Sequence, residues 1–216
     1  DDGSRLTDLG QGYDPTWSPD NKQILFSIAQ ENKEKEQAGI WIMNADGKGR
    51  QWVCMGTSPV FCQDGSRFLF LSNHEGNQSI YVYDMIEGTS KKVLQEEYKK
   101  PNGSARWSPD GKKIAFVDER EGNAELIVFD AAGSEKEKTV RHRGKIGGPI
   151  AWGPNSKIAL WGREKEMTDP RRLYTIPAEG DEGPSIMANQ DTGTSNIDPA
   201  WSPDGKRLVF VSDRAK

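Results

Sequence analysis

One segment, built on the pattern Trp-Ser-Pro-Asp-Gly, recurs along the 216-residue chain and constrains its fold more than any other feature. Its aromatic anchors are spaced 44, 46, 45 and 49 residues apart, at Trp17, Phe61, Trp107, Trp152 and Trp201. A period in the forties, with strand-forming sequence between the anchors, is typical of the blades of a β-propeller. The repeat therefore predicts a ring of similar sheets.

Each copy of the repeat follows the same order of turns and apolar runs. The anchor leads into a turn with Pro and Asp-Gly or Asp-Asn, and then into a short apolar run such as Ile24–Phe26. A second run such as Ile40–Met43 and a weaker one such as Gln51–Val53 follow. Asp and Gly tolerate positive φ, so such a turn between two apolar runs predicts a hairpin. We predict an all-β fold, a β-propeller of four-stranded antiparallel blades with about five repeats visible and with the anchors packed between blades.

The two ends of the chain look like parts of one blade. Residues Asp2–Thr7 resemble the outermost strand of a repeat, whereas the last repeat ends after its second strand. Propellers avoid open sheet edges, and joining terminal strands in one blade is one way to do so. We predict one propeller domain over residues 1–216, its last blade closed by an N-terminal strand at 3–7 and C-terminal strands at 199–213. Whether the parent ring has five or six blades, and whether strands are exchanged between chains, stays open.

Charge and composition argue against several classes of function. The net charge is -4 and the charges of both signs are interspersed, which disfavours nucleic acid as a partner. No apolar run approaches the roughly 18 residues of a membrane span, so we expect no membrane insertion. Cys54 and Cys62 lack the Cys-x-x-Cys spacing of a metal site. A disulfide between them, in an oxidising compartment, stays open.

Residues suited to catalysis are few. The two histidines, His74 and His142, fall at different positions of the repeat, so a shared site is not expected. No Gly-x-Ser-x-Gly elbow occurs. We therefore predict no catalytic residues, no cofactor and no bound metal.

The full pattern of the repeat resembles a known family. Pro199–Arg214 and Asp2–Thr7 are similar to the TolB-type propeller repeat, and the resemblance covers nearly the whole chain. It implies a periplasmic or secreted bacterial protein that acts as a non-catalytic binding module or scaffold. Similar repeats form the propeller of prolyl-oligopeptidase-like serine peptidases, so a fragment of a larger enzyme is the alternative. A stand-alone propeller lyase or lactonase is a third hypothesis.

The repeat also indicates where a partner would bind. In a propeller, the loops that join blades share one face with the loops between second and third strands, and concave faces with converging polar groups are reasonable binding sites. The loop Arg163–Arg172 is unusually long and is a candidate functional insertion. We predict a protein or peptide partner on this face, bound by residues at the ring centre and in the surrounding loops. These are Asp14, Ser58, Ser104, Asp198, His74, Arg120, Arg163, Arg171 and Arg172.

Overall fold

The fold is taken from a computed structural model of the chain. It describes residues 7–29, 37–73, 76–93, 105–120, 123–132, 139–166, 168–180, 182–191 and 193–214. All regular structure in these ranges is β-strand. No helix in the described ranges is long and apolar enough to cross a membrane.

The strands follow one another in groups of four. Their bounds are β1 Tyr13–Trp17, β2 Gln23–Ile28, β3 Gly39–Asn44, β4 Gln51–Cys54, β5 Thr57–Phe61, β6 Arg67–Ser72, β7 Ser79–Asp84, β8 Thr89–Lys92, β9 Arg106–Trp107, β10 Lys113–Arg120, β11 Asn123–Asp130, β12 Thr139–Gly144, β13 Ile146–Trp152, β14 Lys157–Gly162, β15 Arg172–Pro177, β16 Ser185–Ile186, β17 Asn196–Trp201 and β18 Leu208–Ser212.

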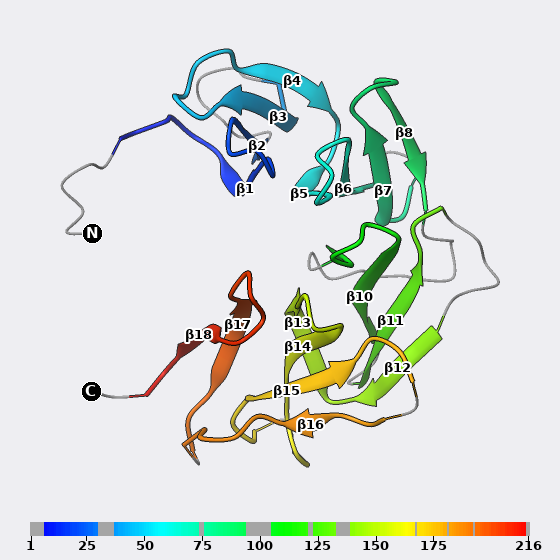
Figure 1. Ribbon diagram of the computed structural model, residues 1–216, viewed down its shortest axis with the longest axis vertical. Helices are drawn as coiled ribbons and strands as arrows, with labels where there is room; N and C mark the ends of the chain where they lie inside the picture. The colour runs from blue at the N-terminus through cyan, green and yellow to red at the C-terminus, as the bar shows by residue number, and fades with distance from the viewer. Residues whose placement is uncertain are drawn as a thin grey trace.

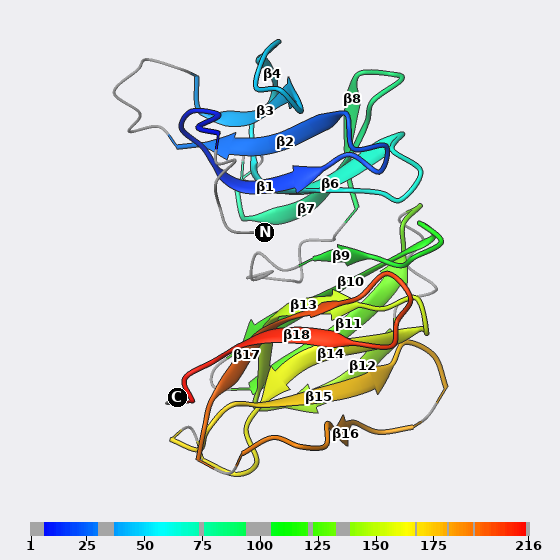
Figure 2. The same cartoon turned by 60° about the vertical axis from the view of Figure 1, so that its left-hand side comes forward.

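The strands form four four-stranded antiparallel sheets and one two-stranded sheet, β17–β18. Figure 1 shows the sheets arranged as blades around a common centre, with β1, β5, β13 and β17 inside and β4, β8, β12 and β16 outside. The predicted all-β propeller of four-stranded blades is therefore confirmed. We number the blades one to five along the chain. Figure 2 shows the blades from another side, with β1–β3 of blade one above and β13–β16 of blade four below. Inner strands of neighbouring blades are in contact, as β1 is with β5 and β13 is with β17.

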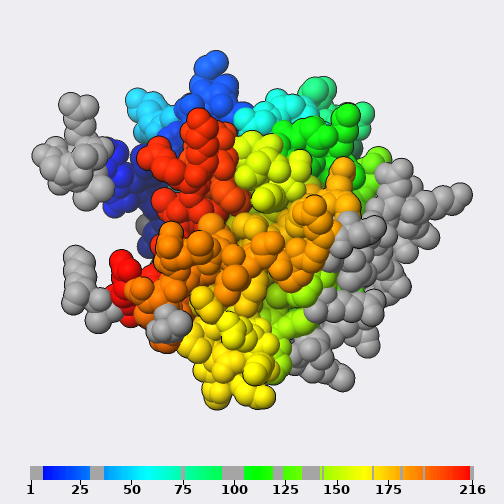
Figure 3. All heavy atoms as spheres, turned by 60° about the horizontal axis from the view of Figure 1, so that its bottom comes forward, coloured from blue at the N-terminus to red at the C-terminus, as the bar shows by residue number. Residues whose placement is uncertain are grey.

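Apolar second strands fill the spaces between the blades. Leu25, Phe70, Phe116 and Leu160 are each at most 1% exposed, as expected of strands covered on both faces. The equivalent strand of blade five differs, because Val209 is 67% exposed and Val211 is 55% exposed. β18 has no third strand beside it among the described residues, and Figure 3 shows these red C-terminal strands at the surface.

The anchors pack between blades where a preceding blade is present. Trp107 is 7% exposed, and its Nε1 donates a 3.0 Å hydrogen bond to the carbonyl oxygen of Val60 in blade two. Trp17 in blade one is 53% exposed, because no described sheet lies against that side. The prediction that every anchor is packed between blades is therefore wrong for Trp17.

The turn after each anchor has the backbone that its residues predict. Gly65, Gly111 and Gly205 have φ values of 72°, 69° and 68°, and Asn21 takes the same conformation at 58°. The carboxylate of the turn accepts hydrogen bonds from within the turn, as when Ser108 Oγ donates to Asp110 Oδ1 at 2.6 Å. These contacts fix the turns that end the inner strands.

The predicted closing strand at residues 3–7 lies outside the described residues, except for Thr7, which is not in a strand. The predicted C-terminal strands correspond to β17 and β18. Closure of the ring by both termini therefore stays a prediction.

Candidate binding site at the centre of the ring

Three predicted site residues share an unusual backbone conformation. Asp14, Ser58 and Asp198 have φ values of 50°, 54° and 51°, which non-glycine residues seldom adopt. Each lies three residues before its anchor, where the pairing of the inner strand with the second strand shifts by one residue. Bulges and left-handed residues of this kind re-aim side chains and are common at functional sites. We call the side of the ring that carries them the loop face, and the side with the Asp-Gly turns the turn face.

Asp14 and Ser58 connect blades one and two at the loop face. Ser58 Oγ donates a 2.9 Å hydrogen bond to Asp14 Oδ2. The backbone N–H of Ser58 donates to Ser27 Oγ of blade one at 3.1 Å, and Ser27 is fully buried. The buried serine therefore holds Ser58 in position, and Ser58 in turn holds one oxygen of Asp14.

Asp198 is exposed in blade five, and its carboxylate makes no hydrogen bond within the described part of the chain. The nearby Asn196 is buried and donates its backbone N–H to the carbonyl oxygen of Arg171 at 2.7 Å. The long loop of blade four therefore reaches the start of β17, close in sequence to Asp198.

Two of the predicted arginines stack on one tryptophan in blade four. The guanidinium carbons of Arg171 and Arg163 lie 4.8 Å and 5.9 Å from the ring centre of Trp161. The indole Nε1 of Trp161 donates to the carbonyl oxygen of Gly148 at 2.7 Å. Stacking of this kind stabilises the arginines and keeps part of each guanidinium available to a ligand.

The long loop is organised by one carboxylate. Asp169 Oδ2 accepts hydrogen bonds of 2.8 Å from the backbone N–H groups of both Lys165 and Glu166, and these bonds lower the pKa of Asp169. Arg163 Nη1 donates to the carbonyl oxygen of the same aspartate. Arg172 is engaged elsewhere, in an ion pair with Glu164 at 2.8 Å.

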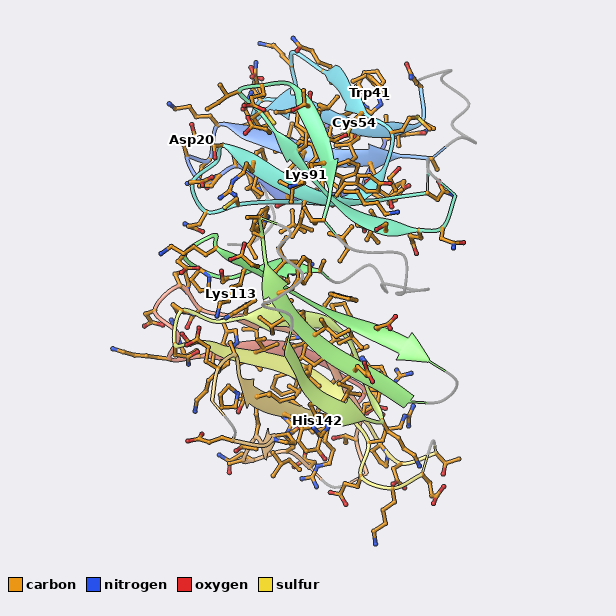
Figure 4. The ribbon with its side chains drawn as sticks, turned by 90° about the vertical axis from the view of Figure 1, so that its right-hand side faces the viewer. Asp20, Trp41, Cys54, Lys91, Lys113 and His142 are labelled. Carbon is orange, nitrogen blue, oxygen red and sulfur yellow. The ribbon has the colours of Figure 1, made fainter. Side chains whose placement is uncertain are left out.

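Arg163 also lines a cavity of about 640 Å³ between blades three and four. His142 stands at its edge, at the end of β12 as the sequence predicts, and burial lowers the pKa of this imidazole. Figure 4 shows His142 far from Cys54 and Trp41 of blade one. The cavity is lined by the outer strand of blade three and by the sheet and long loop of blade four.

The side chains of three predicted binding residues are outside the described part of the chain. His74 and Ser104 lie outside the described residues. Arg120 ends β10, but its side chain also falls outside what the structure describes. Their roles in binding stay predictions.

The sequence analysis did not select Arg106, although it lies at the centre of the ring. Arg106 Nη1 donates to the carbonyl oxygen of Ala105 at 2.9 Å. Burial lowers the pKa of its guanidinium, and the negative charge of Asp14 in blade one opposes that shift. A signal was available, because the equivalent positions hold Thr16, Val60, Ala151 and Ala200, which are all uncharged.

Within the described ranges, no three His, Cys, Asp or Glu side chains lie close enough together to hold a metal ion. Cys54 and Cys62 are not bonded to each other. Burial raises the pKa of Cys54 to about 12, so this thiol is a poor nucleophile in the folded protein. The arrangement at the ring centre offers hydrogen-bonding and charged groups suited to holding a ligand.

Comparison with known proteins places the chain in a family. The TolB beta propeller domain family matches residues 7–190 and, in a second alignment, residues 88–216. The TolB of Acinetobacter baumannii is similar in structure, with a TM-score of 0.67 and 20% identity, over 94% of this chain and 49% of that one.

Two curated relatives are peptidases by name. Dipeptidyl-peptidase 5 of Porphyromonas endodontalis is 33% identical over 85 residues, which is 36% of this chain and 12% of the relative. The uncharacterized peptidase YuxL of Bacillus subtilis is 24% identical over 225 residues, covering 96% of this chain and 30% of the relative. The chain thus spans less than a third of the length of either peptidase. With family matches that together run from residue 7 to residue 216, the chain belongs to the TolB beta propeller domain family.

Proposed function

We propose that the chain is a non-catalytic propeller module that binds a peptide or protein segment at the centre of its loop face. The observation that carries the proposal is the left-handed backbone shared by Asp14, Ser58 and Asp198, each on an inner strand. Such strain costs about 1–3 kcal/mol for each residue and persists where the surrounding structure enforces it, often at ligand sites.

The charges at this centre favour a particular kind of ligand. Asp14 and Asp198 are exposed carboxylates, and Asp14 keeps one oxygen that Ser58 does not occupy. Carboxylates accept strong hydrogen bonds from ammonium groups and from backbone N–H groups. A peptide with a free N-terminal amine satisfies both preferences. Nucleic acid, with its negative phosphates, does not.

A photo-crosslinking experiment tests this assignment. A benzophenone amino acid replaces Ser58 in one protein and Ile86 in another, since Ile86 is 85% exposed in a turn on the opposite face. Each protein is irradiated with a mixed library of synthetic hexapeptides that carry free amines. We expect labelling at position 58 and little at position 86.

Two further measurements complete the test. The double variant Asp14→Asn, Asp198→Asn should bind the library about tenfold more weakly, a loss of about 1.4 kcal/mol, because asparagine keeps an acceptor oxygen at each position but loses the charge. Mass spectrometry of the library should find no cleavage. Equal labelling at both positions, unchanged binding by the double variant or cleaved peptides would each overturn the proposal.

A second candidate function is that the chain is the propeller part of a longer serine peptidase. It is supported by the two curated relatives, which are peptidases by name and of which the chain spans 12% and 30%. On this reading the loop face would hold a substrate segment near a hydrolase domain encoded beside the propeller. A fluorophosphonate probe applied to the protein from the complete gene decides the matter. Labelling of the protein would favour the peptidase function. A complete gene that encodes no serine hydrolase domain would exclude it.

We further propose a periplasmic or secreted location, from the family and from the resemblance to TolB. Fractionation of bacterial cells that express the complete gene tests it. Recovery with the periplasmic or culture fraction is the expected result, and recovery with cytoplasmic markers contradicts it.

A further inference from the structure

A second cavity lies at the ring centre on the turn face, apart from the residues of the loop face. Its volume is about 560 Å³, within the usual range for small-molecule and peptide side-chain sites. Blades two to five all contribute to its wall, which combines aromatic rings and prolines with polar side chains. Its principal lining residues are Phe61, Gln63, Arg106, Trp107, Trp152 and Trp201.

Arg106 brings a positive charge into this wall. Among the described residues, its guanidinium donates one hydrogen bond, to the carbonyl oxygen of Ala105 at 2.9 Å. No carboxylate of the described residues lies within ion-pair distance of it, and the charge of Asp14 acts on it only from farther away. Arg106 is half-buried, and the N–H donors that it does not use form a planar fork that suits a carboxylate.

Trp201 offers a second unused donor in the same cavity. Its indole Nε1 is buried and has no hydrogen-bond partner in the described part of the chain. In blade three the same atom of Trp107 donates to the carbonyl oxygen of Val60 at 3.0 Å, which shows that the preceding blade can supply an acceptor for this group. Burying an unsatisfied donor is costly, and a bound acceptor would remove that cost.

The two donors and the aromatic wall together specify a ligand chemistry. Both polar groups donate, and one carries a positive charge, so the complementary group is an anion with oxygen acceptors. The surrounding tryptophans and prolines favour an apolar neighbour. We propose that this cavity binds a free carboxylate carried next to an apolar group. The C-terminus of a peptide ending in an apolar residue and a small apolar carboxylic acid both have this chemistry.

Calorimetry with three probes tests the inference. The probes are N-acetyl-phenylalanine, its C-terminal amide and 3-phenylpropionate, and none of them carries an amine that the loop face could hold. We expect the amino-acid probe to bind at least tenfold more tightly than its amide, with a change in tryptophan fluorescence. Comparable binding of 3-phenylpropionate would assign the site to small acids, and much weaker binding would assign it to peptide C-termini. Equal binding of acid and amide, or binding of neither, would overturn the inference.

Variants locate the binding within the protein. Arg106→Gln should abolish the preference for the acid, and Trp201→Phe should weaken acid binding several-fold without changing the weak binding of the amide. Arg106→Lys, which keeps a charge but loses the fork, should bind with intermediate strength and serves if the glutamine variant does not fold. Lys48→Gln is the matched control, because it removes a charge that is 83% exposed in a turn of blade one, and it should bind all three probes as the parent does. Retention of the acid preference in Arg106→Gln would contradict the site.

Discussion

The indole Nε1 of Trp107 donates a 3.0 Å hydrogen bond to the carbonyl oxygen of Val60, which belongs to the blade before it. This hydrogen bond joins blade three to blade two. The ring of Trp107 is also almost completely buried. Arg67 of blade two stacks on the same ring at 5.1 Å. The anchor of each repeat therefore depends on the blade that precedes it.

Replacing the anchor should have very different effects in two blades. Trp107→Ala removes a buried indole and should lower the free energy of unfolding by about 3–5 kcal/mol. Trp17→Ala removes a side chain that is 53% exposed and should cost less than about 1 kcal/mol. Urea denaturation of the 216-residue chain measures both. Equal losses would contradict the proposed role of the preceding blade.

The backbone at Asp14 predicts an unusual order of substitutions. Its φ of 50° suits glycine and disfavours β-branched residues. Asp14→Gly should leave stability within about 1 kcal/mol of the parent, whereas Asp14→Val should lower it by about 1–3 kcal/mol. Both changes remove the contact with Ser58, so the difference between their melting curves isolates the backbone. Valine tolerated as well as glycine would argue against a left-handed residue here.

Much of the fold could be predicted from the sequence, because the repeat reports local chemistry. The Asp-Gly turns and apolar runs predict the first three strands of each blade. The outer strands are less well predicted, since β8 covers the polar residues Thr89–Lys92 and ends before the apolar residue Val93. Outer strands make fewer contacts, and so their sequences are less restricted.

The site was harder to predict, because it depends on contacts between distant parts of the chain. The positions of Asp14, Ser58 and Asp198 follow from the repeat, but the stacking of Arg171 on Trp161 depends on how a long loop folds back. Arg106 interrupts a row of uncharged residues, yet only the arrangement of blades brings it near Asp14. Exposure of Trp17 depends on what lies beside blade one, which no property of that residue reveals.

The Cys54 thiol should respond to alkaline pH. Burial raises its pKa from 9.0 to about 12 in the folded protein. Below pH 9 the thiol is protonated in both the folded and the unfolded state. Above it the unfolded chain loses the proton first, so stability should fall between about pH 9 and 12. Thermal melting of the parent and of the Cys54→Ala variant, measured across this pH range, tests the prediction. The variant should lose less stability between about pH 9 and 12 than the parent does. Parallel pH profiles would contradict the burial of the thiol.

The contribution of Asp110, in the blade-three turn, to the stability of the fold should decrease at acid pH. Hydrogen bonds from Ser108 Oγ and the Lys112 N–H lower the pKa of Asp110 below its ordinary 3.8. The stabilisation is therefore complete above the unfolded pKa and is lost as pH falls through the lower folded value. The melting temperature of Asp110→Asn should lie below that of the parent at pH 6, and the difference should shrink by pH 2. A difference that is independent of pH would mean that the charge contributes nothing.

The central claim is that a peptide binds at the loop face through residues placed by the strained inner strands. Crosslinking of a hexapeptide library from position 58 and from position 86 tests it most directly, with the double variant Asp14→Asn, Asp198→Asn as the comparison. We expect labelling from position 58 that falls about tenfold in the double variant, and little labelling from position 86. Labelling that is equal from both faces, or that is unaffected by loss of the two carboxylates, would contradict it.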